Sequence, residues 1–236
     1  MMAQSKVVTY YASTDPLSDP GLYSVLYSIM PAHRRRKIDQ FIFDKDRRLS
    51  MGVELLLRRA MQDLGEDPDA FVSDIEGNGK PVLRGSDVHF NLSHSETMVM
   101  CSVSDSDVGC DVELIRPIDL EIAKRYFYGT EYDTIASQPD LQSMYRMFYR
   151  FWTLKESFMK VTGLGFELEL SDFRINLGPR ITVDQTVDDR EYSFIEYDVG
   201  DGYRYAVSSV GRDFESSMRY VNLGGRNPIN MRVAIR

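Results

Sequence analysis

Residues 139–163 carry the sequence PDLQSMYRMFYRFWTLKESFMKVTG, which predicts the long helix that organises the second half of the chain. Apolar side chains recur there at the three- and four-residue spacing of an amphipathic α-helix. They are Met144, Met147, Phe148, Phe151, Leu154, Phe158 and Val161. Pro139 begins the run and Gly163 ends it, as expected of residues at helix boundaries. We therefore predict a helix over about residues 139–162.

Polar side chains interrupt this helix in a pattern with two possible meanings. Successive residues turn by about 100°, so Trp152, Glu156 and Lys160 line one strip. Lys155 projects close to the apolar stripe, where leucine or methionine would be expected. Either Glu156 and Lys160 form a surface pair while Lys155 extends past its neighbours to water, or the three side chains reach a polar cleft. The combination of a strong apolar stripe with this cluster favours the cleft.

The elements before and after this helix suggest that the chain has two similar halves. A first helix is predicted over about residues 45–64, with Gly65 as its cap. Two strands are predicted around a turn at 77–79. Further strands are predicted over 88–93, 97–103, 108–113, 173–176, 192–197 and 203–210. We expect an α+β fold of two subdomains, 1–105 and 106–236, with pseudo-twofold symmetry and the active site at their interface.

Composition excludes several classes of protein. The chain has 236 residues, of which 43% are hydrophobic, and its net charge is −8 from 28 basic and 36 acidic residues. An acidic chain is a poor non-specific binder of nucleic acid. Two cysteines form no disulfide framework, and no apolar run approaches the ~20 residues of a membrane span. We expect a cytoplasmic monomer that binds neither nucleic acid nor membrane.

Asp111 and Glu113 are candidate metal ligands. They lie two residues apart on a predicted strand, so both side chains leave the same face. Two carboxylates on one face suit Mg²⁺, whose remaining ligands are commonly phosphate and water. For an isolated Asp-x-Glu pair, however, a charged edge strand is the more frequent explanation, so the pair needs support from other residues.

Ser93, His94 and Ser95 lie at the end of a predicted strand. A histidine at this place can donate to a phosphate oxygen or carry a proton, although most such histidines are ordinary loop residues. A Ser/His/Asp hydrolase built on Ser93, His94 and Asp111 is disfavoured. Adjacent residues of a strand point to opposite faces, and the chain has no Gly-x-Ser-x-Gly motif.

Basic residues gather in the first third of the chain. The run His33–Lys37 is followed by Arg47, Arg48, Arg58 and Arg59, and Lys80 and Pro81 follow Gly79 at a turn. Such a run is usually a solvated surface, but arginine is also suited to hold a terminal phosphate.

In their order along the chain, these motifs resemble those of the Sfp-type 4'-phosphopantetheinyl transferases. The segments that carry the resemblance are Gly79–Pro81, Phe90–Ser95, Gly109–Glu113 and Trp152–Lys160. The resemblance extends over almost the whole chain, and the pairing of Asp-x-Glu with Trp-x-x-Lys-Glu-x-x-x-Lys makes it specific. It implies transfer of the phosphopantetheine arm of coenzyme A to a serine of an apo acyl or peptidyl carrier protein, with release of 3',5'-ADP.

The resemblance also implies roles for individual residues. Asp111, Glu113 and Glu156 match the ligands of Mg²⁺, and Lys160 and His94 match contacts to the pyrophosphate. Lys80, Pro81 and Ser93 match positions that line the coenzyme A pocket, and the region of Arg36 matches the basic segment that meets the 3'-phosphate. From its place beside the polar cleft, Lys155 is also expected to bind coenzyme A. Glu156 or a metal-bound water would accept the serine proton, and the sequence does not choose between them. Cys110 departs from the isoleucine usual in the family, and His33 from a lysine.

Two other functions are compatible with parts of this pattern. A Mg²⁺-dependent hydrolase of coenzyme A or a related diphosphate would use the same carboxylates with water as nucleophile. A non-catalytic coenzyme A-binding or carrier-docking protein would have no need of three carboxylates beside a diphosphate. The amphipathic segment Arg116–Phe127 favours the transferase, since it offers a surface on which a carrier protein could dock.

Overall fold

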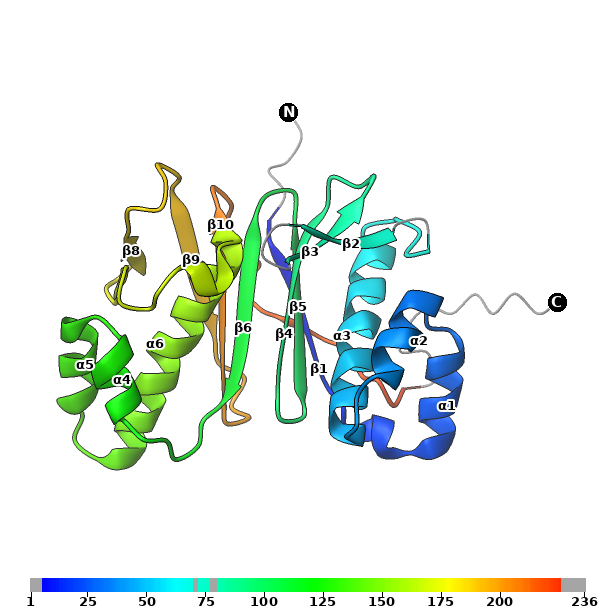
Figure 1. Ribbon diagram of the computed structural model, residues 1–236, viewed down its shortest axis with the longest axis horizontal. Helices are drawn as coiled ribbons and strands as arrows, with labels where there is room; N and C mark the ends of the chain where they lie inside the picture. Colours follow the sequence, from blue (N-terminus) through cyan, green and yellow to red (C-terminus); the bar gives the residue numbers. More distant parts are fainter. Residues whose placement is uncertain (1–5, 70–71, 77–79, 226–236) are drawn as a thin grey trace.

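Two long helices lie on the outer sides of two β-sheets that pack against each other (Figure 1). The computed structural model describes residues 6–69, 72–76 and 80–225. Helix α3 (Asp44–Asp63) covers one sheet and helix α6 (Leu141–Thr162) covers the other. The order of layers is therefore helix, sheet, sheet, helix, and the mixed α+β class expected from the sequence is confirmed.

The sheet under α3 has the strand order β11-β1-β5-β4. Its strands are β1 (Val8–Ser13), β4 (His89–Ser95), β5 (Met98–Ser104) and β11 (Arg219–Tyr220). β1 and β4 run antiparallel to β5, and β11 runs parallel to β1. Alternate side chains point at α3, where Tyr10, Val99 and Cys101 join its apolar face in one core.

The sheet under α6 has the order β6-β10-β9 and is antiparallel. Its strands are β6 (Val108–Leu114), β9 (Tyr192–Tyr197) and β10 (Tyr203–Val210). On the outer face of this sheet, Phe158 of α6 and Ala206 of β10 belong to one apolar core. Val112 and Val207 belong to a third core that also contains Met98 and Met100 of the other sheet, so apolar side chains hold the two sheets face to face.

Capping residues set the ends of α6. The Asp140 carboxylate accepts the Ser143 amide at 2.8 Å, which satisfies a free N–H of the first turn. Gly163 ends the helix at φ 76°, a left-handed conformation that glycine adopts without strain. The helix therefore begins two residues after Pro139 and ends where the sequence predicted.

Shorter elements complete the fold. Helices α1 (Pro20–Ser28) and α2 (Ala32–Asp39) precede α3, and α4 (Glu121–Tyr126) and α5 (Gly129–Ala136) precede α6. The other elements are η1 (Asp15–Ser18), β2 (Val72–Glu76), β3 (Lys80–Arg84), η2 (Gly165–Glu167), β7 (Arg174–Asn176) and β8 (Thr182–Asp184). The pairs β2–β3 and β7–β8 form separate two-stranded sheets. Within the described ranges, no helix is long and apolar enough to span a bilayer.

Strands β4 and β6 lie side by side but are joined through side chains, in a contact that we call the seam. Asn91 Oδ1 accepts the Cys110 amide at 2.9 Å, Ser93 Oγ the Val112 amide at 3.2 Å, and Ser95 Oγ the Leu114 amide at 3.3 Å. The three accepting side chains belong to alternate residues of β4, so they lie on the same face of the strand. Polar side chains on one face of β4 thus replace a backbone ladder between the two sheets.

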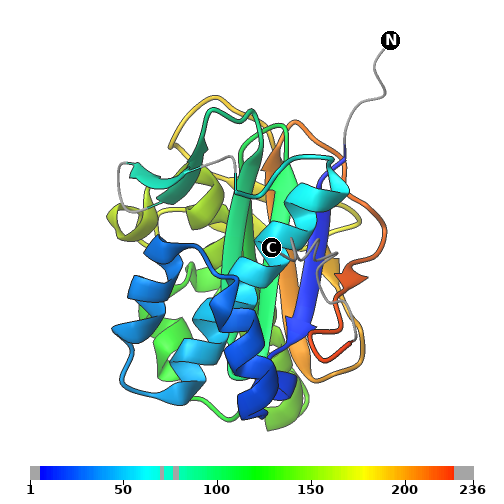
Figure 2. The same cartoon turned by 90° about the vertical axis from the view of Figure 1, so that its right-hand side faces the viewer.

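The last described part of the chain returns to the first sheet. β11 pairs with β1 through Tyr10 and Arg219, and Val221 and Leu223 are buried in the core beneath α3. Figure 2 shows this segment beside β1. Residues distant in sequence from 1–105 therefore complete the N-terminal core.

Candidate active site

Two carboxylates project from the face of β6 that α6 covers. Asp111 and Glu113 occupy alternate positions, so their side chains leave the strand on the same side. Cys110 and Val112 point the other way, into the core between the sheets. The i, i+2 spacing of the acidic pair therefore places both carboxylates at the contact between strand and helix.

Gly109 allows α6 to approach β6 closely. A Cβ atom at this position would lie 2.1 Å from the carbonyl oxygen of Ser157 and 2.5 Å from the amide nitrogen of Val161. These distances are too short for any side chain, so the helix and strand backbones are in contact. The last turns of α6 consequently lie over the carboxylates, and they carry Glu156 and Lys160.

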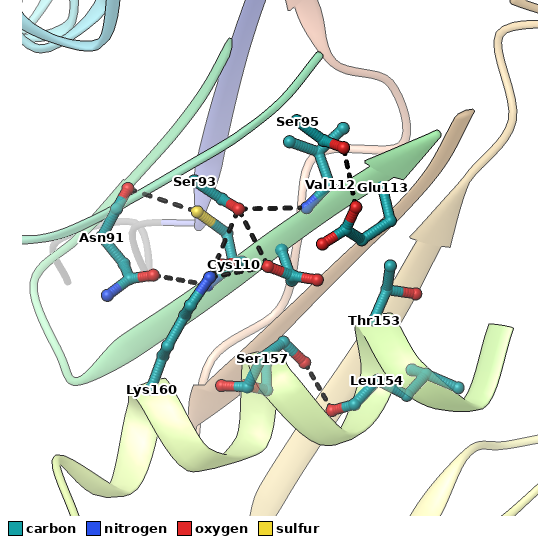
Figure 3. A network of polar contacts seen from close by, with 12 residues as sticks. Asn91, Ser93, Ser95, Cys110, Val112, Glu113, Thr153, Leu154, Ser157 and Lys160 are labelled. Carbon is teal, nitrogen blue, oxygen red and sulfur yellow. Dashed lines mark hydrogen bonds and ion pairs between the residues drawn. The ribbon is translucent and has the colours of Figure 1, made fainter. Parts of the chain in front are cut away.

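Lys160 reaches from α6 to the first of the two carboxylates (Figure 3). Its Nζ lies 2.6 Å from Asp111 Oδ1, 3.1 Å from the carbonyl oxygen of Cys110 and 3.3 Å from Ser93 Oγ. Burial opposes the charge on the lysine, but the charge and hydrogen bond of Asp111, together with the charges of Cys110 and Glu156, outweigh this effect and raise the pKa of Lys160. The lysine therefore remains a cation inside the contact.

Glu113 and Glu156 lie in an environment that disfavours their ionisation. Loss of water raises the pKa of both carboxyl groups, and the negative charge of Asp111 raises it further. Lys160 opposes this effect at both residues. Arg116 also lowers the pKa of Glu113, but Lys160 is the one cation that acts on both glutamates.

A divalent cation fits this donor set in charge and chemistry. Asp111 is 4% exposed, and its Oδ2 is buried without a hydrogen-bond partner. Carboxylate oxygens are the ligands that Mg²⁺ prefers, and a cation would relieve both the unpaired oxygen and the repulsion. Among the described residues, however, no three side chains of His, Cys, Asp or Glu are grouped closely enough to form a ready-made metal site.

Two serines of β4 hold the two carboxylates of β6. Ser93 Oγ donates to Asp111 Oδ1 at 2.8 Å, and Ser95 Oγ donates to Glu113 Oε2 at 2.7 Å (Figure 3). From the sequence, Ser93 was expected to line the coenzyme A pocket, and Ser95 had no expected role. The signal was present in the alternation of Asn91, Ser93 and Ser95 with apolar residues, which marks one polar face of a strand.

His94 lies on the opposite face of β4 from these serines. It is exposed, toward the α3 side of the sheet, and its ring makes no hydrogen bond to the carboxylates in the described structure. Partial loss of water lowers the pKa of His94, and the charge of Lys160 lowers it further. The imidazole therefore favours its neutral form near the site.

Lys155 does not join this group, which corrects the expectation that it binds coenzyme A. It is fully buried in the core under α6. Its Nζ lies 2.9 Å from Glu131 Oε2 and 2.8 Å from the carbonyl oxygens of both Leu170 and Phe173. All three ammonium protons are thus used within the core. Periodicity correctly placed this lysine at the apolar stripe, but its partner is an internal carboxylate.

The remaining predicted ligands are on the N-terminal half. Arg36 is exposed on α2, whereas its neighbour Arg34 is buried in a 2.8 Å ion pair with Glu54. The basic run is therefore only partly available to a ligand. The backbone of Lys80 and Pro81 belongs to β3, but their side chains lie outside the described residues. Figure 2 shows α2 and the β2–β3 hairpin on the side of the sheets that carries the end of α6.

Comparison with known proteins gives two family matches that together cover most of the chain. The model for "4'-phosphopantetheinyl transferase, N-terminal" matches residues 18–106, and that for "4'-phosphopantetheinyl transferase superfamily" matches residues 107–208.

Individual relatives are similar over comparable lengths. A 4'-phosphopantetheinyl transferase of Bacillus subtilis is 35% identical over 204 residues, or 84% of this chain and 90% of the relative. The 4'-phosphopantetheinyl transferase Sfp of Bacillus subtilis is 33% identical over 200 residues, or 83% and 88%. The 4'-phosphopantetheinyl transferase HetI of Nostoc is 37% identical over 173 residues, or 70% and 72%.

Proposed function

The chain belongs to the 4'-phosphopantetheinyl transferase family, and from this premise we propose that the residues between β6 and α6 carry out its reaction. The enzyme transfers 4'-phosphopantetheine from coenzyme A to a carrier protein. The observation that carries the assignment of the site is that Lys160 of α6 contacts Asp111 of β6, with Glu113 on the same face of the strand and Glu156 one turn before Lys160 on the helix.

The reaction needs a positioned nucleophile and stabilisation of negative charge. The serine oxygen of the carrier protein bonds to the β-phosphorus of coenzyme A while the bond from that phosphorus to the bridging oxygen breaks. The leaving group is 3',5'-ADP, and the serine proton passes to a base. Because the leaving 3',5'-ADP gains negative charge on its 5'-phosphate as the bond breaks, catalysis depends on cations and donors placed around the diphosphate.

Asp111, Glu113 and Glu156 would hold Mg²⁺. When bound, Mg²⁺ neutralises the diphosphate and aligns it for displacement. Lys160 supplies a second positive charge, already fixed by Asp111 at 2.6 Å. Glu156 lies one helical turn before Lys160 on α6, and its carboxylate makes no hydrogen bond in the described structure. It is therefore our candidate for the base.

The substrates approach from both halves of the chain. We place the active site at the interface of subdomains 1–105 and 106–236, with the C-terminal strand β11 returning to the first. In support, Ser93 and Ser95 come from one half and Asp111 and Glu113 from the other. Glu96 joins the halves at the end of the seam, since Lys45 and Arg116 both contact its carboxylate, at 2.5 and 3.0 Å.

Coenzyme A would lie on the side of the seam where α2, the β2–β3 hairpin and the end of α6 are found, with His94 near the pyrophosphate. Arg36, Lys80 and Pro81 would contact the nucleotide end.

The carrier protein would dock on the segment Arg116–Phe127, which directly follows β6 and exposes basic side chains on α4. We expect the enzyme to act as a monomer, since both halves of the site come from one chain.

The experiment is to incubate the protein with coenzyme A, Mg²⁺ and an apo carrier protein and to measure the mass of the carrier. We expect a gain of one phosphopantetheine group. Glu113→Ala and Glu156→Ala should each abolish the gain while the circular dichroism spectrum stays unchanged. Wild-type rates in either variant would refute the metal assignment. Loss of coenzyme A with no gain of carrier mass would indicate hydrolysis instead.

A further inference from the structure

The two serines of the seam have the same relation to β6. Each hydroxyl accepts the amide that follows a carboxylate residue and donates its proton to that carboxylate. A hydroxyl has one proton, so after this donation it can only accept further hydrogen bonds. Asp111 and Glu113 are therefore held from the N-terminal half of the molecule, although both belong to a strand of the other half.

The two carboxylates differ in what else holds them. Asp111 also accepts a hydrogen bond from Lys160 Nζ at 2.6 Å, and the same ammonium group donates to the carbonyl oxygen of Cys110. Glu113 has no ion pair within the described part of the chain, and Ser95 is its one hydrogen-bond donor there. Its side chain is longer than that of aspartate and has one more torsion to fix. Ser95 is thus the group that determines where the Glu113 carboxylate lies.

We propose that Ser95 is a positioning residue for the transferase reaction, which acts by fixing one oxygen of Glu113 so that the other is presented to the metal. This inference rests on the proposed role of Glu113 as a metal ligand. An ordered carboxylate has less conformational entropy to lose when it binds a cation. Partners that orient a metal ligand typically contribute 10- to 100-fold to metal affinity or activity.

The seam gives this role a further consequence. Ser95 also accepts the Leu114 amide, so its hydroxyl can hold Glu113 only while β4 and β6 are in register. The position of the metal ligand therefore depends on correct seating of one half of the molecule on the other. A change of seating would displace Glu113 before it displaced Asp111, which Lys160 secures from α6 of its own half.

The test measures metal binding directly, with Mn²⁺ as the probe and electron paramagnetic resonance as the readout, in the presence of coenzyme A. Ser95→Ala should weaken Mn²⁺ binding by about 10- to 100-fold. The Mn²⁺ concentration for half-maximal transfer should rise by the same factor. Ser95→Thr keeps the hydroxyl and should restore most of the affinity.

Two further variants make the outcome specific. Ser106→Ala removes a hydroxyl that donates to the carbonyl oxygen of Val210 at 2.9 Å, beyond the other end of β6, and should bind Mn²⁺ like the wild type. Glu113→Gln removes the proposed metal ligand, so its Mn²⁺ affinity shows how much binding is lost without that carboxylate. If Ser95→Ala is too unstable to purify, Ser95→Cys replaces it with a side chain of similar size that donates only weakly.

Wild-type Mn²⁺ affinity in Ser95→Ala, or in Ser95→Cys where that variant replaces it, would overturn the inference. If Glu113→Gln still weakens binding in that case, Ser95 alone has been misassigned. If Glu113→Gln also binds Mn²⁺ like the wild type, the proposed metal role of Glu113 fails and the inference about Ser95 fails with it.

Discussion

Replacement of Lys155 by methionine tests whether this lysine stabilises the fold or binds substrate. The ammonium group is fully buried and is held by Glu131 and two carbonyl oxygens at 2.8–2.9 Å. Methionine fills a similar volume but leaves the Glu131 carboxylate buried without a counter-charge. Breaking a buried pair in this way costs about 3–5 kcal/mol. Native proteins have only about 5–15 kcal/mol of stability, so the loss is a large part of the total.

Urea unfolding followed by tryptophan fluorescence measures this loss. Trp152 is the single tryptophan of the chain, and its ring lies 6.2 Å from that of Phe127, which Lys155 also contacts. With an m-value of about 3 kcal/mol per molar urea, the midpoint should fall by about 1 to 1.7 M. Adding Glu131→Gln should recover part of the loss, because it removes the unpaired charge.

Enzyme assays on folded Lys155→Met complete the test. The KM for coenzyme A should stay unchanged, since the lysine is remote from the phosphates in our assignment. Lys124→Met is the matched control, because Lys124 is 57% exposed and its replacement should alter stability by no more than about 0.5 kcal/mol. A wild-type urea midpoint together with a raised KM for coenzyme A would refute the structural role of Lys155.

Three further predictions concern other contacts of the site. Gly109→Ala should destabilise the protein by about 1–3 kcal/mol or more, and should lower kcat, because a Cβ cannot fit 2.1 Å from Ser157 O; an unchanged melting temperature would contradict the close helix–strand contact. Without metal, the stability advantage of Glu156→Gln over the wild type should grow as the pH rises above the ordinary glutamate pKa of 4.5. Because the folded pKa of Glu156 is raised, ionisation costs the wild type stability through that range, so melting curves that keep a constant gap from pH 4 to 8 would argue against this reasoning. Lys124→Glu with Arg125→Glu should raise the KM for carrier protein but not for coenzyme A, and equal effects on both constants would count against docking on α4.

The helices and the acidic strand could be predicted because their signals are local. The apolar stripe from Met144 to Val161 and the boundary at Gly163 define α6 within a short window of sequence. The two-residue spacing of Asp111 and Glu113 requires one face whatever the rest of the fold does. The sequence therefore predicted the mixed α+β class and placed the two strand carboxylates together.

Lys155 shows where this reasoning fails. Its position in the helix revealed a charge on the apolar face but not which partner would meet it. Glu131 belongs to α5, and its carboxylate reaches the lysine only after α5 and α6 pack together. A buried ion pair and a phosphate-binding lysine give the same local pattern, so the distinction requires the tertiary structure.

The role of Ser95 was hidden for a related reason. The polar alternation through Asn91, Ser93 and Ser95 predicts that one face of β4 meets something hydrophilic, yet it does not name the partner. Strand β6 follows later in the chain and belongs to another sheet. Which amide each hydroxyl accepts depends on the register of that contact, and no local rule determines it.

The return of β11 to the first sheet bears on how the protein is made. During synthesis, β1 leaves the ribosome long before its parallel neighbour β11 and the buried Leu223 do. The N-terminal half cannot bury its core fully until Val221 and Leu223 have been synthesised. Premature termination late in translation would therefore damage the half of the molecule that was synthesised first.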